Sequence, residues 1–218
     1  RQRTAWMYQG NGSKLLGEFY AKYNVVAFPA GNTGAQMGGW YRKEIKSLAD
    51  FQGLKMRIGG FGGTVVGGIG GVPQNIPGGE IYQALEKGTI DACEWVGPYD
   101  DMKLGFNKVA PYYYYPGWWE GGPEIDVMIN RDAYNKLPKE YQAIISAASA
   151  KAMINMTAKY DARNPQALKT LLASGTKLRQ MPKDIMDAAF NFAMKSYDEL
   201  SDTNEDWKKI YSDYKGFR

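Results

Sequence analysis

The stretch IYQALEKGTIDACEWVGPYDD, from Ile81 to Asp101, carries two secondary-structure signals in direct succession. Apolar residues at Ile81 and Leu85 have the spacing of one helix face, and Gly88 is a typical helix stop. The mostly apolar run Ile90–Val96 then predicts a strand. A helix that leads directly into a strand is typical of α/β proteins, so this stretch indicates the fold class.

The surrounding sequence extends the same alternation. Gly and Pro are frequent up to about residue 125 and separate short apolar runs from short helical ones. The runs that predict further strands are VVAFPAG (Val25–Gly31), LKMRIGG (Leu54–Gly60), YYYYPGWWE (Tyr112–Glu120), EIDVMIN (Glu124–Asn130) and TKLRQM (Thr176–Met181). Strands separated by short helices favour an α/β fold with a mainly open sheet.

Helix-forming residues dominate after Pro138. Residues 139–174 predict one long helix that Pro165 kinks, and residues 182–218 predict C-terminal helices that begin after Pro182. The apolar face expected for the first of these helices consists of Ile144, Ile145, Ala148, Ala152 and Met156.

Composition excludes several kinds of site. The chain has no His and a single Cys, which removes imidazole metal sites, Ser-His and Cys-His dyads, intrachain disulfides and thiolate zinc clusters. Its net charge of +4 is small and scattered, which gives no indication of nucleic-acid binding. The chain starts without Met or an apolar leader, which says nothing about its compartment.

The glycine run GGFGGTVVGGIGG (Gly59–Gly71) invites comparison with nucleotide-binding loops. The spacing G-x-G-x-x-G fails from Gly60, because residue 65 is Val, and the Lys-Ser/Thr pair of a P-loop is absent. We therefore expect a glycine-rich helix that packs closely on the sheet.

Arg57 lies near the carboxyl end of the predicted strand Leu54–Gly60. A guanidinium at that place can bind a carboxylate through two parallel hydrogen bonds, and ligands of open α/β folds gather at such strand ends. An ordinary surface salt bridge explains the same pattern, and the sequence leaves both interpretations open.

Three more polar residues lie at the ends of predicted strands or in the loops next to them. Glu94 and Glu120 end predicted strands, and Gln36 lies in the loop GNTGAQMGGW. Side-chain oxygens of this kind, with a main-chain carbonyl, can form an all-oxygen site for a hard cation. Glu94 could instead pair with Arg57 or cap a helix that starts near Pro98. Paired with Glu120, it could also serve a glycoside hydrolase.

Four phrases together resemble the solute receptors of TRAP transporters: AGNTGAQMGGWY (Ala30–Tyr41), LKMRIGG, IYQALEKGTIDACEWVGPYDD and YYYYPGWWEGG (Tyr112–Gly122). Among these receptors the chain is most similar to those for α-keto acids and related small monocarboxylates. The resemblance implies a two-lobe, periplasmic-binding-protein fold. It also implies that residues 1–218 are the C-terminal two-thirds of a receptor, cross between the lobes more than once, and lack an N-terminal part.

The resemblance also implies roles for individual residues. Arg57 matches the arginine that clamps the substrate carboxylate. Gln36, Glu94 and the main-chain carbonyl of Trp95 match the ligands of a metal ion, Na⁺ in most of these receptors and Ca²⁺ in some lactate-binding relatives. The substrate completes that metal shell, so Gln36 and Glu94 lie beside it, and Glu120 matches a further acid at the pocket.

The expected function is that of a periplasmic receptor without enzymatic activity. It would bind a small 2-oxo or 2-hydroxy monocarboxylate with a metal ion and deliver it to the membrane permease of a TRAP transporter. A homodimer formed through the C-terminal helix is a further expectation, with packing on the chain's own lobe as the alternative. A receptor for another organic acid, such as a sugar acid, and a carboxylate-dependent glycoside hydrolase are the competing functions.

Overall fold

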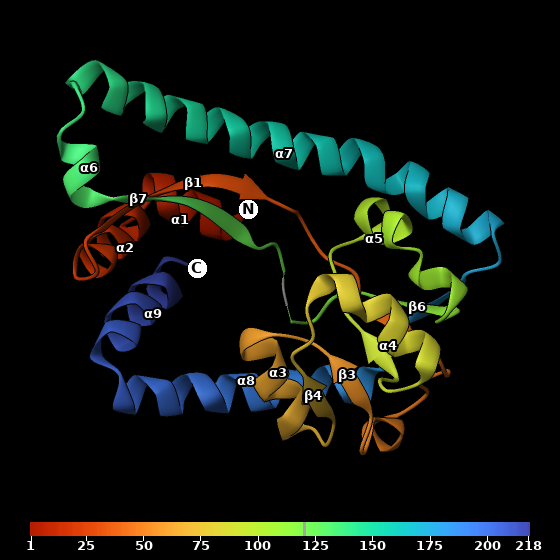
Figure 1. Cartoon of the computed structure of the whole chain (residues 1–218). Coiled ribbons are helices and arrows are strands. Elements are labelled where there is room, and N and C mark those ends of the chain that lie inside the picture. The colour runs from red at the N-terminus through yellow and green to blue at the C-terminus, as the bar shows by residue number, and fades with distance from the viewer. Residues whose placement is uncertain (120) are drawn as a thin grey trace. The chain divides into compact units, whose positions relative to one another are not determined.

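A computed structural model describes every residue of the chain except Glu120. The chain divides into two compact units (Figure 1). Unit 1 consists of residues 1–32, 124–155 and 195–218, and unit 2 consists of residues 33–123 and 156–194. None of the described helices combines the length and the apolar character that crossing a bilayer requires.

Unit 2 is built on a mixed six-stranded sheet with the strand order β4-β3-β5-β2-β6-β8. Strand β3 runs parallel to both β4 and β5, β2 runs antiparallel to β5 and β6, and β6 runs parallel to β8. The strands are β2 (Gly39–Tyr41), β3 (Lys55–Arg57), β4 (Val72–Gln74), β5 (Ala92–Cys93), β6 (Tyr112–Tyr115) and β8 (Lys177–Gln180).

Helices cover both faces of this sheet, as expected for an α/β fold. Because side chains alternate along a strand, Tyr41, Met56 and Tyr114 enter one core with residues of α3 (Gly60–Gly68) and α8 (Lys183–Thr203). Trp40 and Tyr113 enter the other core. That second core includes residues of α4 (Ile81–Lys87), α5 (Pro98–Leu104) and the C-terminal part of α7 (Lys139–Ala173).

The glycine run forms helix α3, which follows β3 directly. A Cβ atom on Gly68 would lie 2.2 Å from the ring of Phe192 in α8. A Cβ atom on Gly63 would lie 3.5 Å from the side chain of Pro73 in β4. These glycines therefore allow close packing of α3, as the sequence predicted, and they form no loop of the P-loop kind.

Unit 1 contains a two-stranded antiparallel sheet of β1 (Val25–Asn32) and β7 (Glu124–Asn130). Its helices include α1 (Gln2–Gln9), α2 (Gly12–Ala21), α6 (Arg131–Asn135) and α9 (Glu205–Phe217). Trp6, Met7 and Leu15 form a small core with Ile210 and Tyr214. The indole of Trp6 donates a hydrogen bond of 2.7 Å to Asp213, which ties α9 to α1.

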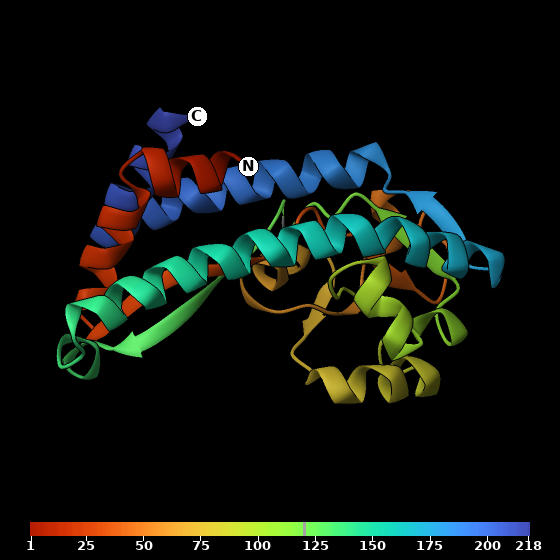
Figure 2. The same cartoon turned by 90° about the horizontal axis from the view of Figure 1, so that it is seen from above.

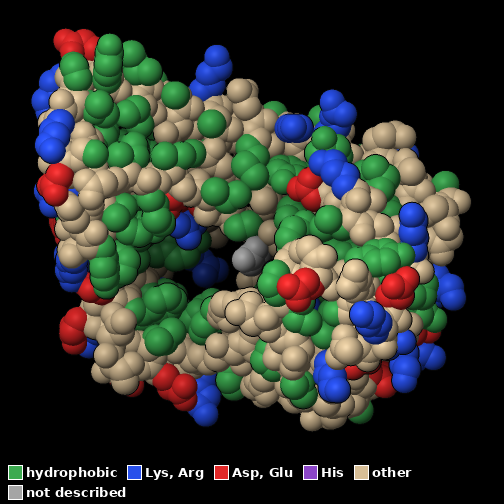
Figure 3. Space-filling model, in the orientation of Figure 1, with side chains coloured by type: hydrophobic (Ala, Val, Ile, Leu, Met, Phe, Trp, Pro, Cys, Tyr) green, Lys and Arg blue, Asp and Glu red, His purple; other side chains and the backbone are tan. Residues whose placement is uncertain are grey.

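Helices α7 and α8 contribute residues to both units, and Figures 1 and 2 show each of them as an unbroken ribbon. Helix α7 continues through Pro165. The buried positions of α7 are Ser149, Met153, Ala167 and Leu171. The apolar face predicted for this helix is wrong in its first half: Ile144 is 62% exposed, and apolar side chains gather on the surface over the start of α7 (Figure 3).

Gly39 in β2 is required by the way the sheet is paired. Its φ of +94° lies in the left-handed region, and a Cβ atom would lie 2.5 Å from the carbonyl oxygen of Cys93 in β5. We expect Gly39→Ala to lower the free energy of unfolding, measured by urea denaturation, by more than about 2 kcal/mol. Gly53→Ala is the control, because Gly53 has a φ of +74° with no atom within 4 Å of its Cβ position. Equal losses in the two variants would show that the close approach of Gly39 to Cys93 is unimportant.

Candidate functional site

The structure brings Arg57 and Glu94 together at one edge of the sheet in unit 2. Arg57 is the last residue of β3, and Glu94 directly follows β5. These strands are parallel neighbours with Arg57 opposite Cys93, so both side chains leave the sheet at the carboxyl ends of adjacent strands. Open α/β sheets bind their ligands at this edge.

Arg57 is held from several directions. Its Nη1 forms an ion pair with the Glu94 carboxylate and also donates a 3.2 Å hydrogen bond to the Glu94 main-chain oxygen. Its Nε donates to the carbonyl oxygen of Ile76 at 3.2 Å, and its Cζ lies 5.2 Å from the centroid of the Trp95 ring. The two charged side chains are only 17% and 12% exposed, so this ion pair is largely removed from water.

Gln36 lies on the neighbouring segment. The main-chain N–H of Met37 donates to the carbonyl oxygen of Val96 at 3.2 Å, which places the Gln36 loop beside Glu94–Val96. Gln36 is 7% exposed, and within the described part of the chain its buried Oε1 has no hydrogen-bond partner. A buried oxygen without a donor costs free energy, so a ligand that binds this oxygen recovers that cost.

Two tryptophans belong to the segment that precedes Glu120, which itself lies outside the described residues. The rings of Trp118 and Trp119 meet edge to face with centroids 4.7 Å apart, and both pack against the core that contains Ile58. Their indole Nε1 atoms are buried and have no acceptor among the described residues. Sequence analysis did not identify these two indole N–H groups as site groups. The only sequence feature that points to them is the Trp-Trp pair itself.

Asp101 is a buried acid that sequence reasoning missed. It is 1% exposed and accepts four hydrogen bonds, from the main-chain N–H groups of Val96 and Gly97 and from the side chains of Trp40 and Tyr113. Burial raises the pKa of Asp101 to about 6, although the four hydrogen bonds act in the opposite direction. The only sequence signal was a pair of acids in the first turn after Pro98, which is a common surface pattern.

The residues present fit a hard cation with oxygen ligands. In the part of the chain that is described, no three or more His, Cys, Asp or Glu side chains are grouped so that they could hold a metal ion, so a metal here depends partly on neutral oxygens. Gln36 Oε1 is buried without a hydrogen-bond partner among the described residues. Glu94, which has a carboxylate, and Trp95, which has a main-chain carbonyl, directly follow β5 at the same edge. Ca²⁺ accepts such irregular mixtures of carboxylate, amide and carbonyl oxygens.

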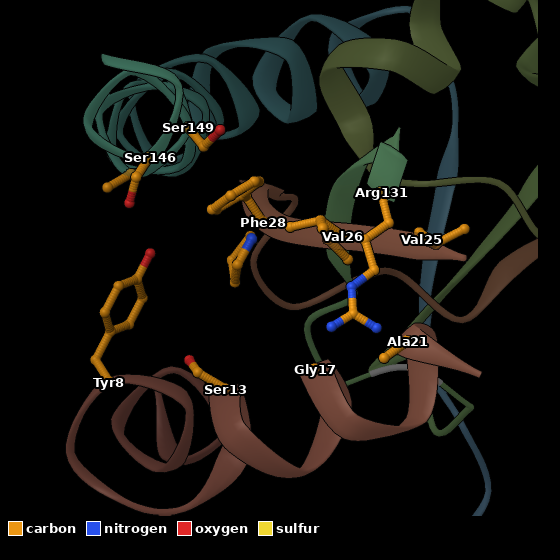
Figure 4. A pocket seen from close by; sticks show the side chains of 13 residues that line it. Tyr8, Ser13, Gly17, Ala21, Val25, Val26, Phe28, Arg131, Ser146 and Ser149 are labelled. Atoms are coloured by element: carbon orange, nitrogen blue, oxygen red, sulfur yellow. The ribbon is translucent and has the colours of Figure 1, made fainter. Parts of the chain in front are cut away.

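A separate cavity of about 430 Å³ lies within unit 1. Figure 4 shows the hydroxyl of Tyr8 pointing toward Ser146 across this cavity, while the side chain of Arg131 reaches toward α2. Residues 25–29 of β1 form its wall, and none of the site residues predicted from the sequence lines it.

Comparison with known proteins gives consistent matches. Residues 1–204 match the DctP family model, described as bacterial extracellular solute-binding protein, family 7. Over all 218 residues the chain is 53% identical to a monocarboxylate 2-oxoacid-binding periplasmic protein of Nostoc sp., of which it covers 60%. The chain therefore spans less than two thirds of that relative.

Two solved TRAP solute-binding proteins have the same fold. One from Bordetella bronchiseptica is 56% identical with a TM-score of 0.96, and the match covers 100% of this chain and 65% of that one. That structure is a mixed-occupancy dimer, with copurified calcium and picolinate bound in the active site versus an apo site. One from Pseudoalteromonas atlantica, with bound sodium and pyruvate, is 42% identical with a TM-score of 0.93, and the match covers 99% of this chain and 66% of that one.

The raised pKa of Asp101 makes stability depend on pH in a defined direction. The folded protein holds the Asp101 proton up to about pH 6, whereas the unfolded chain loses it near 3.8, so the contribution of Asp101 to stability falls as pH rises through this window. We expect the free energy of unfolding, relative to that of Asp101→Asn, to fall by roughly 2–3 kcal/mol across it. Urea denaturation of both proteins at several pH values measures this difference. A difference that does not change with pH would contradict the raised pKa.

Proposed function

Because the chain belongs to family 7 of the bacterial extracellular solute-binding proteins, the DctP family, we propose that it is part of a TRAP transporter receptor for a small 2-oxo or 2-hydroxy monocarboxylate. The receptor binds this acid together with a metal ion in the periplasm and delivers it to the membrane permease. Relatives named for 2-oxoacid binding, or solved with pyruvate and sodium, support this choice of ligand. The family consists of solute-binding proteins, so a glycoside hydrolase is no longer a candidate.

The observation that carries this proposal is the composition of one edge of the sheet. A mostly buried arginine and carboxylate face each other there, and an amide oxygen that has no donor among the described residues lies on the adjacent segment. An acid with a 2-oxo group offers a carboxylate to Arg57 and two oxygens to a cation. Gln36, Glu94 and the Trp95 carbonyl would hold that cation, which supplies positive charge between the acid and Glu94. Glu120 remains part of the proposed set as a further acid.

Charge balance couples the two ligands. In the structure Arg57 and Glu94 neutralise each other. An acid alone would draw Arg57 away and leave Glu94 uncompensated, and a cation alone would leave Arg57 uncompensated. Burying a charge without a partner is costly, so the acid and the cation bind far better together than separately. Each ligand must then raise the affinity for the other by the same factor.

Calorimetry on the full-length protein tests the proposal. We expect pyruvate to bind in the presence of Na⁺ or Ca²⁺ and at least tenfold more weakly with a chelator and no Na⁺, because the cation offsets the charge of Glu94. Arg57→Ala should abolish the heat of pyruvate binding, since no other group is proposed to pair with the carboxylate. Glu94→Gln should weaken binding in the presence of the cation at least tenfold.

Arg42→Ala is the matched control. Arg42 forms a comparable but more exposed ion pair with Asp91 at 3.8 Å, also in unit 2, and its loss should leave binding unchanged. Absence of heat with any small carboxylate would overturn the proposed function. Normal binding of pyruvate by Glu94→Gln without metal would overturn only the metal-dependent part, because the acid would then bind without a cation.

We also propose that units 1 and 2 belong to the two lobes of such a receptor. Residues 1–218 would then be its C-terminal two-thirds, with the chain crossing between the lobes several times. The alternation of chain segments between the two units supports this assignment.

A homodimer formed through the C-terminal helix is the last part of the proposal. A dimer in the Bordetella crystal structure and the 63% exposure of Phe190 on α8 support it. Met186 packs into the first core of unit 2 and Tyr197 packs on Trp207, so these two apolar side chains of α8 are partly occupied within the chain. Light scattering should give the mass of two chains, and Phe190→Ser should shift it toward one. A monomer mass for the unmodified protein at micromolar concentration would exclude the dimer.

A further inference from the structure

Asp101 joins the segments that carry the proposed cation ligands. Its Oδ1 accepts from the N–H groups of Val96 and Gly97 at 3.1 and 3.0 Å, directly after Trp95. Its Oδ2 accepts from Trp40 Nε1 at 3.0 Å and from the Tyr113 hydroxyl at 2.7 Å. All four of these donors are uncharged. They therefore orient the buried carboxylate without neutralising its charge.

The two side-chain donors connect Asp101 to the rest of the site. Trp40 lies in β2, four residues after Gln36, and Tyr113 lies opposite it in β6. Their rings stack with centroids 3.9 Å apart and an interplanar angle of 14°. A rigid aromatic pair in the sheet therefore fixes one oxygen of Asp101, and the other oxygen fixes the turn after Glu94 and Trp95.

The peptide group between Trp95 and Val96 connects Asp101 to the proposed cation site. Its N–H donates to the Asp101 carboxylate, and its C=O is the main-chain oxygen assigned to the cation. Hydrogen bonds to an ionised acceptor are stronger than those to a neutral one, and bonds in a chain polarise one another. Withdrawal of the N–H proton toward Asp101 increases the electron density on the Trp95 carbonyl oxygen, which makes it a better ligand for a cation.

We propose that Asp101 is a positioning residue of the cation site, which aims and polarises the Trp95 carbonyl through the Val96 N–H. This inference rests on the proposed function, because it assigns a role toward the cation of that same site. A neutral residue of the same shape cannot replace it. Asn would turn an NH₂ group toward either the peptide N–H groups or the indole N–H, and donors would then face donors.

Calorimetric titration of the full-length protein with Ca²⁺ at saturating pyruvate is the first arm of the test. We expect Asp101→Asn to weaken Ca²⁺ binding at least tenfold, which is the usual effect of losing a group that supports a metal ligand. Asp100→Asn is the matched control, because Asp100 lies in the same helix turn but bonds to Lys103 and Tyr160. It should bind Ca²⁺ within twofold of the unmodified protein.

Tyr113→Phe separates positioning from stability. It removes one hydrogen bond from the same carboxylate but keeps the bond to Val96. We expect its thermal midpoint in chelator to fall while its Ca²⁺ affinity changes less than threefold. Equal weakening of Ca²⁺ binding in Tyr113→Phe and Asp101→Asn would overturn the proposal, as would normal Ca²⁺ binding by Asp101→Asn.

A spectroscopic readout keeps the test valid even if Asp101→Asn does not fold. Within residues 1–218 Trp95 and Val96 are the only Trp-Val pair, so labelling Trp with ¹³C at the carbonyl and Val with ¹⁵N isolates this peptide group by NMR. Addition of Ca²⁺ and pyruvate to the unmodified protein should shift the Trp95 carbonyl signal and move the Val96 amide proton downfield. A folded Asp101→Asn variant should show that proton upfield.

The outcomes distinguish the two levels of inference. Heat of binding in the unmodified protein, together with an unmoved Trp95–Val96 signal, overturns the Trp95 carbonyl as a cation ligand and with it the role of Asp101. The proposed binding of a small monocarboxylate together with a cation is then left intact. No heat with any small carboxylate in the unmodified protein, in the presence of either Ca²⁺ or Na⁺, overturns both. Heat together with a shifted signal, and loss of affinity confined to Asp101→Asn, supports both.

Discussion

The ion pair between Arg57 and Glu94 is the constraint on which the site depends. Two opposite charges leave the sheet at the ends of neighbouring parallel strands, where each is mostly buried. Such a pair is costly to break unless both charges receive new partners at once. A carboxylate with a cation meets that condition, whereas a neutral solute or a single ion does not. The parallel pairing of β3 with β5, which brings the two charges together, therefore supports the proposal of a carboxylate that binds together with a cation.

Much of the fold follows from local sequence signals. Helix α4 ends at Gly88, whose φ of +73° needs glycine, and β7 has the predicted bounds. Strand β5 is only Ala92–Cys93, shorter than predicted, and beyond it the Val96 carbonyl accepts a hydrogen bond from the Met37 N–H of the Gln36 loop. The three-residue strands β2 and β4 went unnoticed, since periodicity cannot be read at that length. The first half of α7 carries apolar residues that remain exposed among the described residues, so its periodicity did not predict burial.

The candidate site was only partly accessible to the same reasoning. Arg57 and Glu94 stand at strand ends, a position that pattern alone can find, and their pairing was one of the alternatives. Gln36 has no pattern of its own, and its proposed role as a cation ligand rests on family resemblance and on a buried oxygen that has no partner among the described residues. Asp101 looks like a surface acid in the sequence. Its burial results from the register that brings Trp40 beside Tyr113, which is a long-range property of the sheet.

The most direct test of this account is a crystal structure of the full-length protein with pyruvate and Ca²⁺. The account predicts a calcium ion about 2.3–2.6 Å from Gln36 Oε1, a Glu94 carboxylate oxygen and the Trp95 carbonyl oxygen, with Arg57 turned from Glu94 to the pyruvate carboxylate. A calcium ion or pyruvate bound elsewhere, with the ion pair between Arg57 and Glu94 still intact, would contradict it.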